Sequence, residues 1–169
     1  MRCANLVLGF RLGLQRPTVQ MEKLNDTLLY TLDKCFRTYH QFAQRNVRQA
    51  GYDITIDQWL ILKNVAENPG ITQKDISKIV FKDGASVTRI IQLLVNAGYL
   101  VRTVHSSDGR RVKLTLTESG KKITVAVNEI AIHNRATALQ GISHDQIDQM
   151  KALLQQVISN CNSKKETNK

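Results

Sequence analysis

The chain is poor in the residues that build disulfide frameworks and metal sites. Its 169 residues include three cysteines, Cys3, Cys35 and Cys161, which are widely separated and odd in number. The sequence contains no Cys-x-x-Cys pair and no cluster of cysteine with histidine. Neither a disulfide-stapled secreted domain nor a zinc site is therefore indicated, and we expect no metal and no cofactor. A reducing cytoplasm is the expected location.

Long apolar stretches and catalytic groupings are missing as well. No apolar run is long enough to span a bilayer, so no membrane segment is predicted. No nucleophile, base and acid stand in a recognisable arrangement, and no glycine-rich phosphate-binding loop is present. We therefore interpret the chain as a non-enzyme with no catalytic residues.

Positive charge is what the chain has in excess. Its 24 lysines and arginines outnumber its 14 aspartates and glutamates, which gives a formal net charge of +10. Such an excess favours an anionic partner, and nucleic acid is the usual one. A basic protein that is merely well solvated is the alternative, and charge alone leaves the two near even.

The first twenty residues differ from the rest. They contain Arg2, Arg11 and Arg16 and no acidic residue. The apolar run 6–10 is short and is followed by Arg11, which makes it a poor secretory signal. We expect residues 1–20 to be a non-native extension or a mobile basic arm, with a targeting peptide as the lesser alternative. One domain is expected over residues 21–162, followed by a polar tail at 163–169.

Apolar residues at three- and four-residue steps predict a long first helix from about Leu24 to Gln49. The residues of this stripe are Leu24, Leu28, Leu32, Phe36, Tyr39, Ala43 and Val47. Thr55 and Gln58 fit a capping box that begins a second helix. Thr72 caps a third helix, which is expected to turn Ile76, Ile79 and Val80 inward.

The fourth predicted helix runs from an Asp83 cap to Asn96 and has two contrasting faces. Its expected buried stripe consists of Val87, Ile90, Ile91 and Leu94. The opposite face carries Ser86, Thr88, Arg89, Gln92 and Asn96. Short polar groups and a guanidinium are the groups that contact base edges and phosphates.

A β-hairpin is predicted after Gly98, with strands at Leu100–His105 and Val112–Leu116. The turn between them, Ser106–Arg111, carries Asp-Gly followed by two arginines. Two short helices followed by such a hairpin are typical of a winged helix-turn-helix, which presents one helix to the DNA major groove. We expect a mainly α fold with a small hairpin wing, whose DNA-binding lobe covers about residues 55–117.

Two more helices follow the hairpin. Thr117 is expected to cap a helix that Gly141 ends, and Ser143 with Gln146 forms a second capping box before the last helix. The helices at about 24–50 and 118–161 carry apolar stripes too long for one small winged helix to cover. We therefore interpret them as dimerisation helices.

Several segments together resemble the multiple-antibiotic-resistance regulator (MarR) family, over the range from about Leu24 to Asn160. The matching segments are Gln58–Leu62, Ser86–Leu94, Ala97–Leu100, Asp108–Arg111 and Leu116–Gly120. The resemblance implies a cytoplasmic homodimer that binds double-stranded DNA and regulates transcription, most often as a repressor. It also implies a fourth helix in the major groove and a wing arginine in the minor groove.

The resemblance also assigns residue roles. The groove-contacting residues would be Ala85, Ser86, Thr88 and Arg89, with Gln92 on the same face. At the wing, Asp108 would orient Arg110, and Arg111 is a further candidate because Gly109 stands where many members carry a second arginine. An architectural DNA-binding protein with little sequence preference is the alternative function. A protein-interaction module that has lost DNA binding is a third.

Other residues have two interpretations. Tyr30, Phe36, Tyr39 and Trp59 either line a cleft for a small-molecule effector of unknown identity or belong to the core, which is the commoner role. Cys35 is expected to be a buried packing residue rather than a redox switch. Lys74, Lys78 and Lys82 are expected on a solvated face, with phosphate contact as the alternative.

Overall fold

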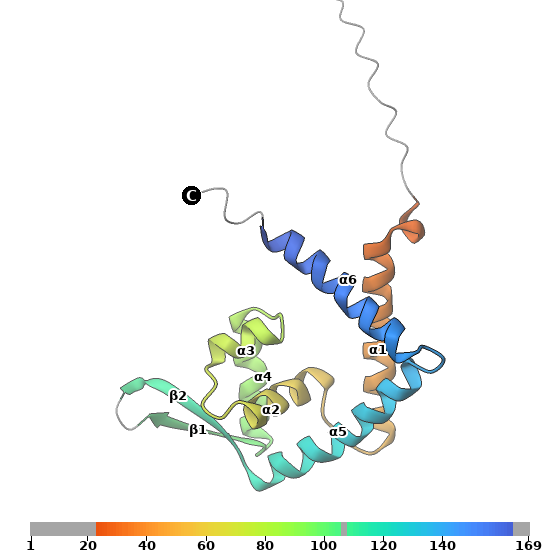
Figure 1. Cartoon of the computed structure of the whole chain (residues 1–169). Coiled ribbons are helices and arrows are strands. Elements are labelled where there is room, and N and C mark those ends of the chain that lie inside the picture. Colours follow the sequence, from red (N-terminus) through yellow and green to blue (C-terminus); the bar gives the residue numbers. More distant parts are fainter. Residues whose placement is uncertain (1–22, 106–107, 164–169) are drawn as a thin grey trace, which may run out of the picture. The chain divides into compact units, whose positions relative to one another are not determined.

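A computed structural model of the chain describes residues 23–105 and 108–163, and it describes side chains there except at 104–112 and 163 (Figure 1). The expected extension at 1–20 and nearly all of the polar tail lie outside the described residues. The chain divides after Phe36 into two compact units. No helix in the described part is long and apolar enough to cross a membrane.

The described part of the first unit consists of a short 3₁₀ turn, η1 (Leu24–Asp26), and the beginning of helix α1 (Leu28–Gln49). The expectation that α1 begins at Leu24 was wrong, because Thr27 has an extended backbone (ψ 123°) that separates the two helices. Leu28 and Phe36 are 63% and 66% exposed, and Cys35 is exposed too. The predicted burial of Cys35 was also wrong, since no other described element of this unit covers it.

In the second unit, the remainder of α1 leads to three helices: α2 (Ile56–Glu67), α3 (Gln73–Ile79) and α4 (Gly84–Asn96). The capping box of α2 is confirmed. The Gln58 backbone N–H donates to the Thr55 hydroxyl at 3.1 Å, and the Thr55 N–H donates to the Gln58 amide oxygen at 2.8 Å. These bonds satisfy donors that a helix start otherwise leaves unpaired.

The wing is a two-stranded antiparallel sheet of β1 (Leu100–His105) and β2 (Asp108–Leu116). The expected turn at Ser106–Arg111 was too long, because Asp108–Arg111 belong to β2. The pairing is regular from Leu100 opposite Leu116 to Val104 opposite Val112 and then shifts to His105 opposite Asp108. Residues 109–111 therefore form an irregularity in β2, next to the connection at 106–107, which lies outside the described residues.

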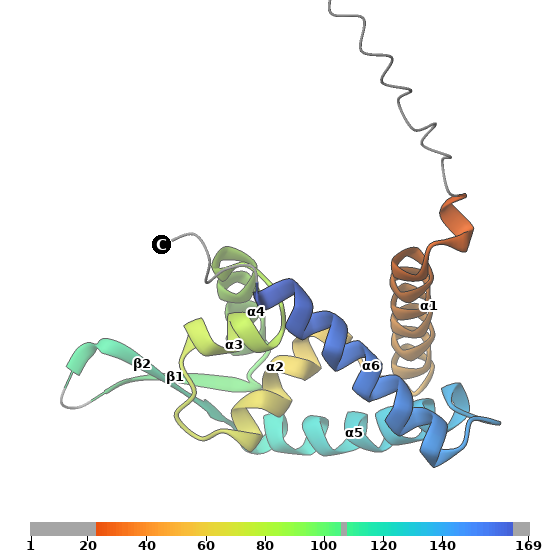
Figure 2. The ribbon, with the colours of Figure 1, turned by 45° about the horizontal axis from the view of Figure 1, so that its top comes forward.

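Helix α5 (Glu118–Ala138) begins at the base of the hairpin, and α6 (His144–Ser163) follows after a turn (Figure 2). Both predicted starts are confirmed: Thr117 accepts from the Gly120 N–H at 2.9 Å, and Ser143 and Gln146 form the second capping box. Gly141, in the turn, has φ +81°, a conformation that glycine adopts without the penalty of a side chain.

The core of the second unit lies where α2, α4, α5 and the base of the hairpin meet. Its fully buried side chains include Ile61, Leu62, Ile76, Ile91, Leu94 and Leu100. Trp59 is buried as predicted, and its indole N–H donates to the Thr124 carbonyl at 3.2 Å. The expectation that Ile79 points inward was wrong, because its side chain is exposed at the last turn of the short helix α3.

The base of the wing is fastened to the start of α5 by several short contacts. The hydroxyls of Thr117 and Ser119 both donate to the Gly98 carbonyl, at 2.7 and 2.8 Å. The Thr117 N–H donates to the Tyr99 carbonyl at 3.1 Å. A Cβ atom on Gly120 would lie 2.0 Å from that same Tyr99 oxygen, so only glycine fits there. These contacts fix the direction in which the hairpin leaves the helices.

Candidate nucleic-acid interface

The helix-turn-helix consists of α3, α4 and the short connection between them. Phe81 in this connection has φ +52°, which is unusual for a bulky residue, and its side chain is 93% exposed. Asp83 follows as the N-cap of α4. The pKa of Asp83 is held below its usual value, mainly by a hydrogen bond from the Ser86 hydroxyl and next by one from the Ser86 backbone N–H. The cap therefore stays ionised at the positive end of the helix.

The outward face of α4 is polar and open, as the sequence predicted. Ala85, Thr88, Arg89 and Gln92 are exposed on it, while Val87, Ile91 and Leu94 are buried on the opposite face. Within the described part of the chain, Arg89 forms no hydrogen bond and no ion pair. Its guanidinium is thus available to an external acceptor.

Ser86 and Thr88, two of the three predicted site residues with internal partners in the described structure, are engaged near the start of α4. The Ser86 hydroxyl donates to the Asp83 carboxylate at 2.7 Å, so it supports the cap. The Thr88 hydroxyl donates to the Gly84 carbonyl at 2.7 Å and accepts from the Gln73 side-chain amide. Gln73 was not predicted as a site residue, because the contact joins two helices and leaves no mark in a local pattern.

Gln92 also has internal partners at both ends of its amide. The Arg102 guanidinium donates to its oxygen at 3.0 Å, and its nitrogen donates to the Asn96 amide oxygen at 2.8 Å. Arg102 lies on β1, so this chain of bonds links the wing to α4. No local pattern in the sequence marks Arg102 as a site residue.

The three predicted wing residues, Asp108, Arg110 and Arg111, all lie on β2. Arg110 and Arg111 fall in its irregular stretch, and Asp108 pairs with His105 next to the connection. Their side chains lie outside the described part of the structure. The predicted orientation of Arg110 by Asp108 therefore stays a prediction.

Two lysines near the helix-turn-helix each contact a carboxylate. Lys78 contacts Asp75 at 3.2 Å, and Lys82 contacts Asp57 of α2 at 3.0 Å. The other oxygen of Asp57 lies 3.7 Å from His40 on α1. The connection that precedes α4 is therefore tied through Asp57 to α2 and α1.

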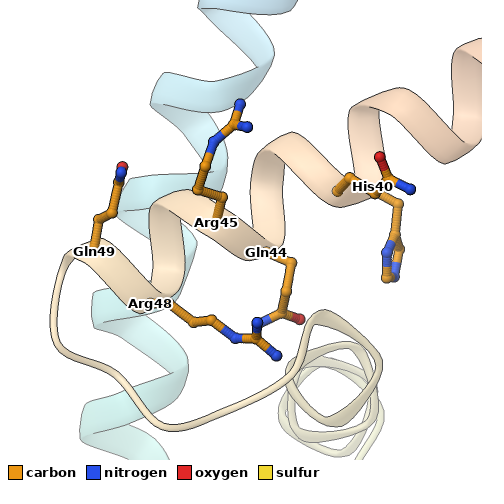
Figure 3. A pocket seen from close by; sticks show the side chains of 6 residues that line it. His40, Gln44, Arg45, Arg48 and Gln49 are labelled. Carbon is orange, nitrogen blue, oxygen red and sulfur yellow. The ribbon is translucent and has the colours of Figure 1, made fainter.

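An open pocket of about 460 Å³ lies on the second half of α1. Figure 3 shows that His40, Gln44 and Arg48 point to one side of the helix and Arg45 and Gln49 to the other. Gln44 is used structurally, since it donates to the Ile54 carbonyl and accepts from the Ile56 N–H. The pocket residues do not converge on one point. Among the described residues, no group of three or more histidine, cysteine, aspartate or glutamate side chains lies close enough to hold a metal.

Comparison with known proteins agrees with this geometry. Residues 52–111, which span α2 to the wing, match the model of the MarR family. Over these residues the chain is similar to the MarR family. It is 29% identical over 115 residues to the helix-turn-helix transcriptional regulator YybA of Bacillus subtilis strain 168, a match that covers 68% of this chain and 77% of YybA. With this similarity and with relatives named as helix-turn-helix transcriptional regulators, the chain is a transcriptional regulator and not an enzyme.

Solved structures extend the likeness to most of the chain. The transcriptional regulator SlyA is 26% identical, with a TM-score of 0.72 over 83% of this chain and 98% of SlyA. MepR of S. aureus, solved as a complex with DNA, is 28% identical, with a TM-score of 0.71 over 80% and 97% of the two chains. The predicted fold, mainly α with a hairpin wing, is confirmed.

Proposed function

We propose that the protein is a homodimeric, sequence-specific double-stranded DNA-binding regulator that represses transcription. The outward face of α4 carries this proposal. It presents Ala85, Thr88 and Arg89 to solvent, while the opposite stripe is anchored in the core. A helix held in this way can lie in the major groove with its polar face toward the base edges.

The first residue of α4 supports the same function. A Cβ added at Gly84 would meet no atom within 4 Å, and its backbone does not need positive φ. The chain's own packing therefore does not require glycine, which costs up to about 1 kcal/mol in a helix relative to alanine. A slim helix start suits close approach of a DNA backbone.

We assign base-edge or phosphate contacts to Arg89, and a place at the same interface to Ala85, Ser86, Thr88 and Gln92. At the wing, Arg110 and Arg111 are proposed to contact phosphates or the minor groove, with Asp108 orienting Arg110. The wing assignment rests on the sequence pattern and on the position of these residues in β2. The DNA complex of MepR and the net charge of +10 support DNA as the partner.

A second copy of the chain is the proposed partner in assembly. Apolar side chains of α6 such as Leu153 are exposed, and so are Leu28 and Phe36 in the first unit. Pairing of two copies would cover such surfaces and present two equivalent α4 helices. The operator should then be roughly palindromic, with half-sites about one helical turn apart. Cytoplasmic location is part of the proposal.

Selection of genomic fragments by the wild-type protein, followed by sequencing and footprinting, tests this function. A palindromic site bound far more tightly than random duplex, and lower reporter output from its promoter, are the expected results. Equal affinity for every duplex would instead favour the architectural alternative. Reporter output that increases as more protein is supplied would contradict the repressor role but not sequence-specific DNA binding.

Replacement of Arg89 tests the role of α4. Arg89→Ala should weaken binding to the selected site by about 1–3 kcal/mol and relax base preference at one position in each half-site. Arg135→Ala, which removes an exposed arginine from the last turn of α5, is the matched control and should leave base preference unchanged. An unchanged base preference in Arg89→Ala would show that Arg89 does not contact a base.

A small-molecule effector is the remaining partner that the family resemblance suggests. The pocket on α1 gives an effector little support, because the side chains that line the pocket diverge. The Gln44 amide is also already hydrogen-bonded to the Ile54 carbonyl and the Ile56 N–H. We therefore propose no ligand chemistry for that pocket.

A further inference from the structure

A chain of three polar side chains joins the wing to the outward face of α4. Arg102 of β1 donates to Gln92, and Gln92 donates to Asn96, at 3.0 and 2.8 Å. Gln92 and Asn96 are one helical turn apart and continue the face that begins with Ala85 and Arg89. The Arg102 guanidinium is therefore held at the carboxyl end of the face proposed to meet DNA.

The direction of these bonds is fixed by chemistry. An arginine side chain can only donate, so the oxygen of the Gln92 amide must face Arg102. The nitrogen of that amide then faces Asn96, whose oxygen accepts it. The relay has a single arrangement, and that arrangement restricts the Arg102 side chain, which is otherwise exposed.

The partner of Arg102 leaves its charge intact. Lys78 and Lys82 each contact a carboxylate, which offsets their charge. Arg102, in contrast, is held by a neutral amide, and it makes no ion pair with any described residue. Only its Nη1 is engaged by Gln92, and a guanidinium carries five N–H donors in a fixed fork. An oriented fork that makes no ion pair with the described side chains matches the geometry of a phosphate group.

We propose that Arg102 is a phosphate-binding residue, and that Gln92 and Asn96 are positioning residues that aim its guanidinium at the DNA backbone. The proposal rests on the DNA-binding function above and deepens it. Gln92 then contributes to DNA binding through Arg102 rather than by contacting a base. The wing and α4 would engage the duplex as one unit, since a single hydrogen-bond relay spans both.

A salt titration of binding measures the phosphate contact. The probes are a duplex selected from a randomised library by the wild-type protein and a duplex of random sequence. Arg102→Ala should weaken binding to both by roughly tenfold or more, because a hydrogen bond to a charged group is lost. It should also lower the slope of log affinity against log salt by about one per subunit. Arg102→Lys keeps the charge without the fork and should retain the slope while losing part of the affinity.

The relay is tested by a double-mutant cycle. Gln92→Ala should weaken binding in the wild-type background and have little further effect in Arg102→Ala, because its contribution passes through Arg102. Additive losses would overturn the positioning role, since Gln92 would then contact DNA independently. Gln92→Glu sharpens the test: it should hold Arg102 more firmly and yet weaken DNA binding, because the carboxylate offsets the guanidinium charge.

Controls separate this inference from the function on which it rests. Lys151→Ala removes one positive charge from α6, where Lys151 contacts Asp148, and should leave the salt slope unchanged. Thermal unfolding of each variant checks that it is folded, and replacement of an exposed arginine should leave the unfolding temperature nearly unchanged. If wild-type protein binds and Arg89→Ala weakens it while Arg102→Ala keeps the wild-type slope on both duplexes, the inference alone is wrong. If wild-type protein binds neither duplex, the proposed function fails and the inference fails with it.

Discussion

Helices α4 and α6 have the same kind of amphipathic pattern, yet of the two only α4 has its apolar stripe buried by the residues that the structure describes. Val87, Ile91 and Leu94 of α4 are inaccessible to solvent or nearly so. On α6, Leu153 is 69% exposed and Ile158 is 51% exposed, and no side chain described on this helix is buried. Both helices begin with a side-chain cap, so local structure does not account for the difference.

The difference shows that periodicity predicts an apolar face but not what covers it. The stripe of α4 meets α2, α3 and the first strand of the wing. The stripe of α6 has no such cover among the described residues, and exposed apolar surface of this kind usually marks an interface. We therefore interpret α4 as a helix stabilised by its own chain and α6 as one that depends on a second copy.

Truncation of the α4 stripe should have the largest effect. Ile91→Ala removes a fully buried side chain and should lower the free energy of unfolding by about 2–5 kcal/mol. Leu93→Ala on the same helix is the control, since Leu93 is exposed, and its effect should be well below that of Ile91→Ala. Urea unfolding at one fixed protein concentration measures both. Equal effects would mean that α4 is not anchored through this stripe.

The corresponding change in α6 should act on assembly rather than on folding of the winged helix. Leu153→Ala should weaken the dimer by about 1.5–3 kcal/mol per subunit, the value of burying a leucine. Sedimentation equilibrium measures the dissociation constant, and Gln155→Ala on the opposite face of α6 is the matched control. A dimer unaffected by Leu153→Ala would place the interface elsewhere. A wild-type protein that stays monomeric with intact helices would contradict the interpretation of α6 as a dimerisation helix.

The sequence predicted those features that depend on neighbouring residues. The capping residues Thr55, Thr117 and Ser143 were found correctly because each bonds within three residues of itself. The start of β2 was missed because strand pairing with β1, not local composition, extends it to Asp108. At the candidate interface, the exposed face of α4 followed from its period of 3.6 residues. The bond from Arg102 to Gln92 spans ten positions and two element types, so no local pattern announces it.

A smaller effect is expected at the first residue of α4, where stability and binding should move in opposite directions. Gly84→Ala should raise the free energy of unfolding by at most about 1 kcal/mol, since a Cβ there meets open space. The same methyl group should weaken DNA binding, because it stands between the helix start and the DNA backbone. Chemical unfolding and a duplex-binding titration measure the two quantities. Unchanged affinity for DNA would show that the start of α4 at Gly84 does not lie close to the DNA backbone.

The smallest expected effect concerns acid sensitivity. Because the pKa of Asp83 is lowered in the folded protein, its contribution is present above the unfolded pKa and is lost as the pH falls through the lower folded value. Asp83→Asn keeps an N-cap acceptor that does not titrate, so the stability of the variant should fall less steeply with pH below about 4. The cap of α6 is a serine and should add no such pH dependence. Urea midpoints at several acidic pH values measure the slopes, and parallel slopes would contradict the assignment.

The contact between Gly120 and the Tyr99 carbonyl has a consequence for sequence variation. A single added carbon at position 120 would collide with the backbone at the base of the wing, whatever the tip of the hairpin does. Within Leu116–Gly120, part of the family resemblance, Thr117, Ser119 and Gly120 are therefore constrained by contacts with the protein's own main chain. Relatives that bind different operators can diverge along α4 and at the wing tip, but they can be expected to keep this joint. Part of what identifies the family is thus a packing requirement, and it carries no information about which DNA sequence is bound.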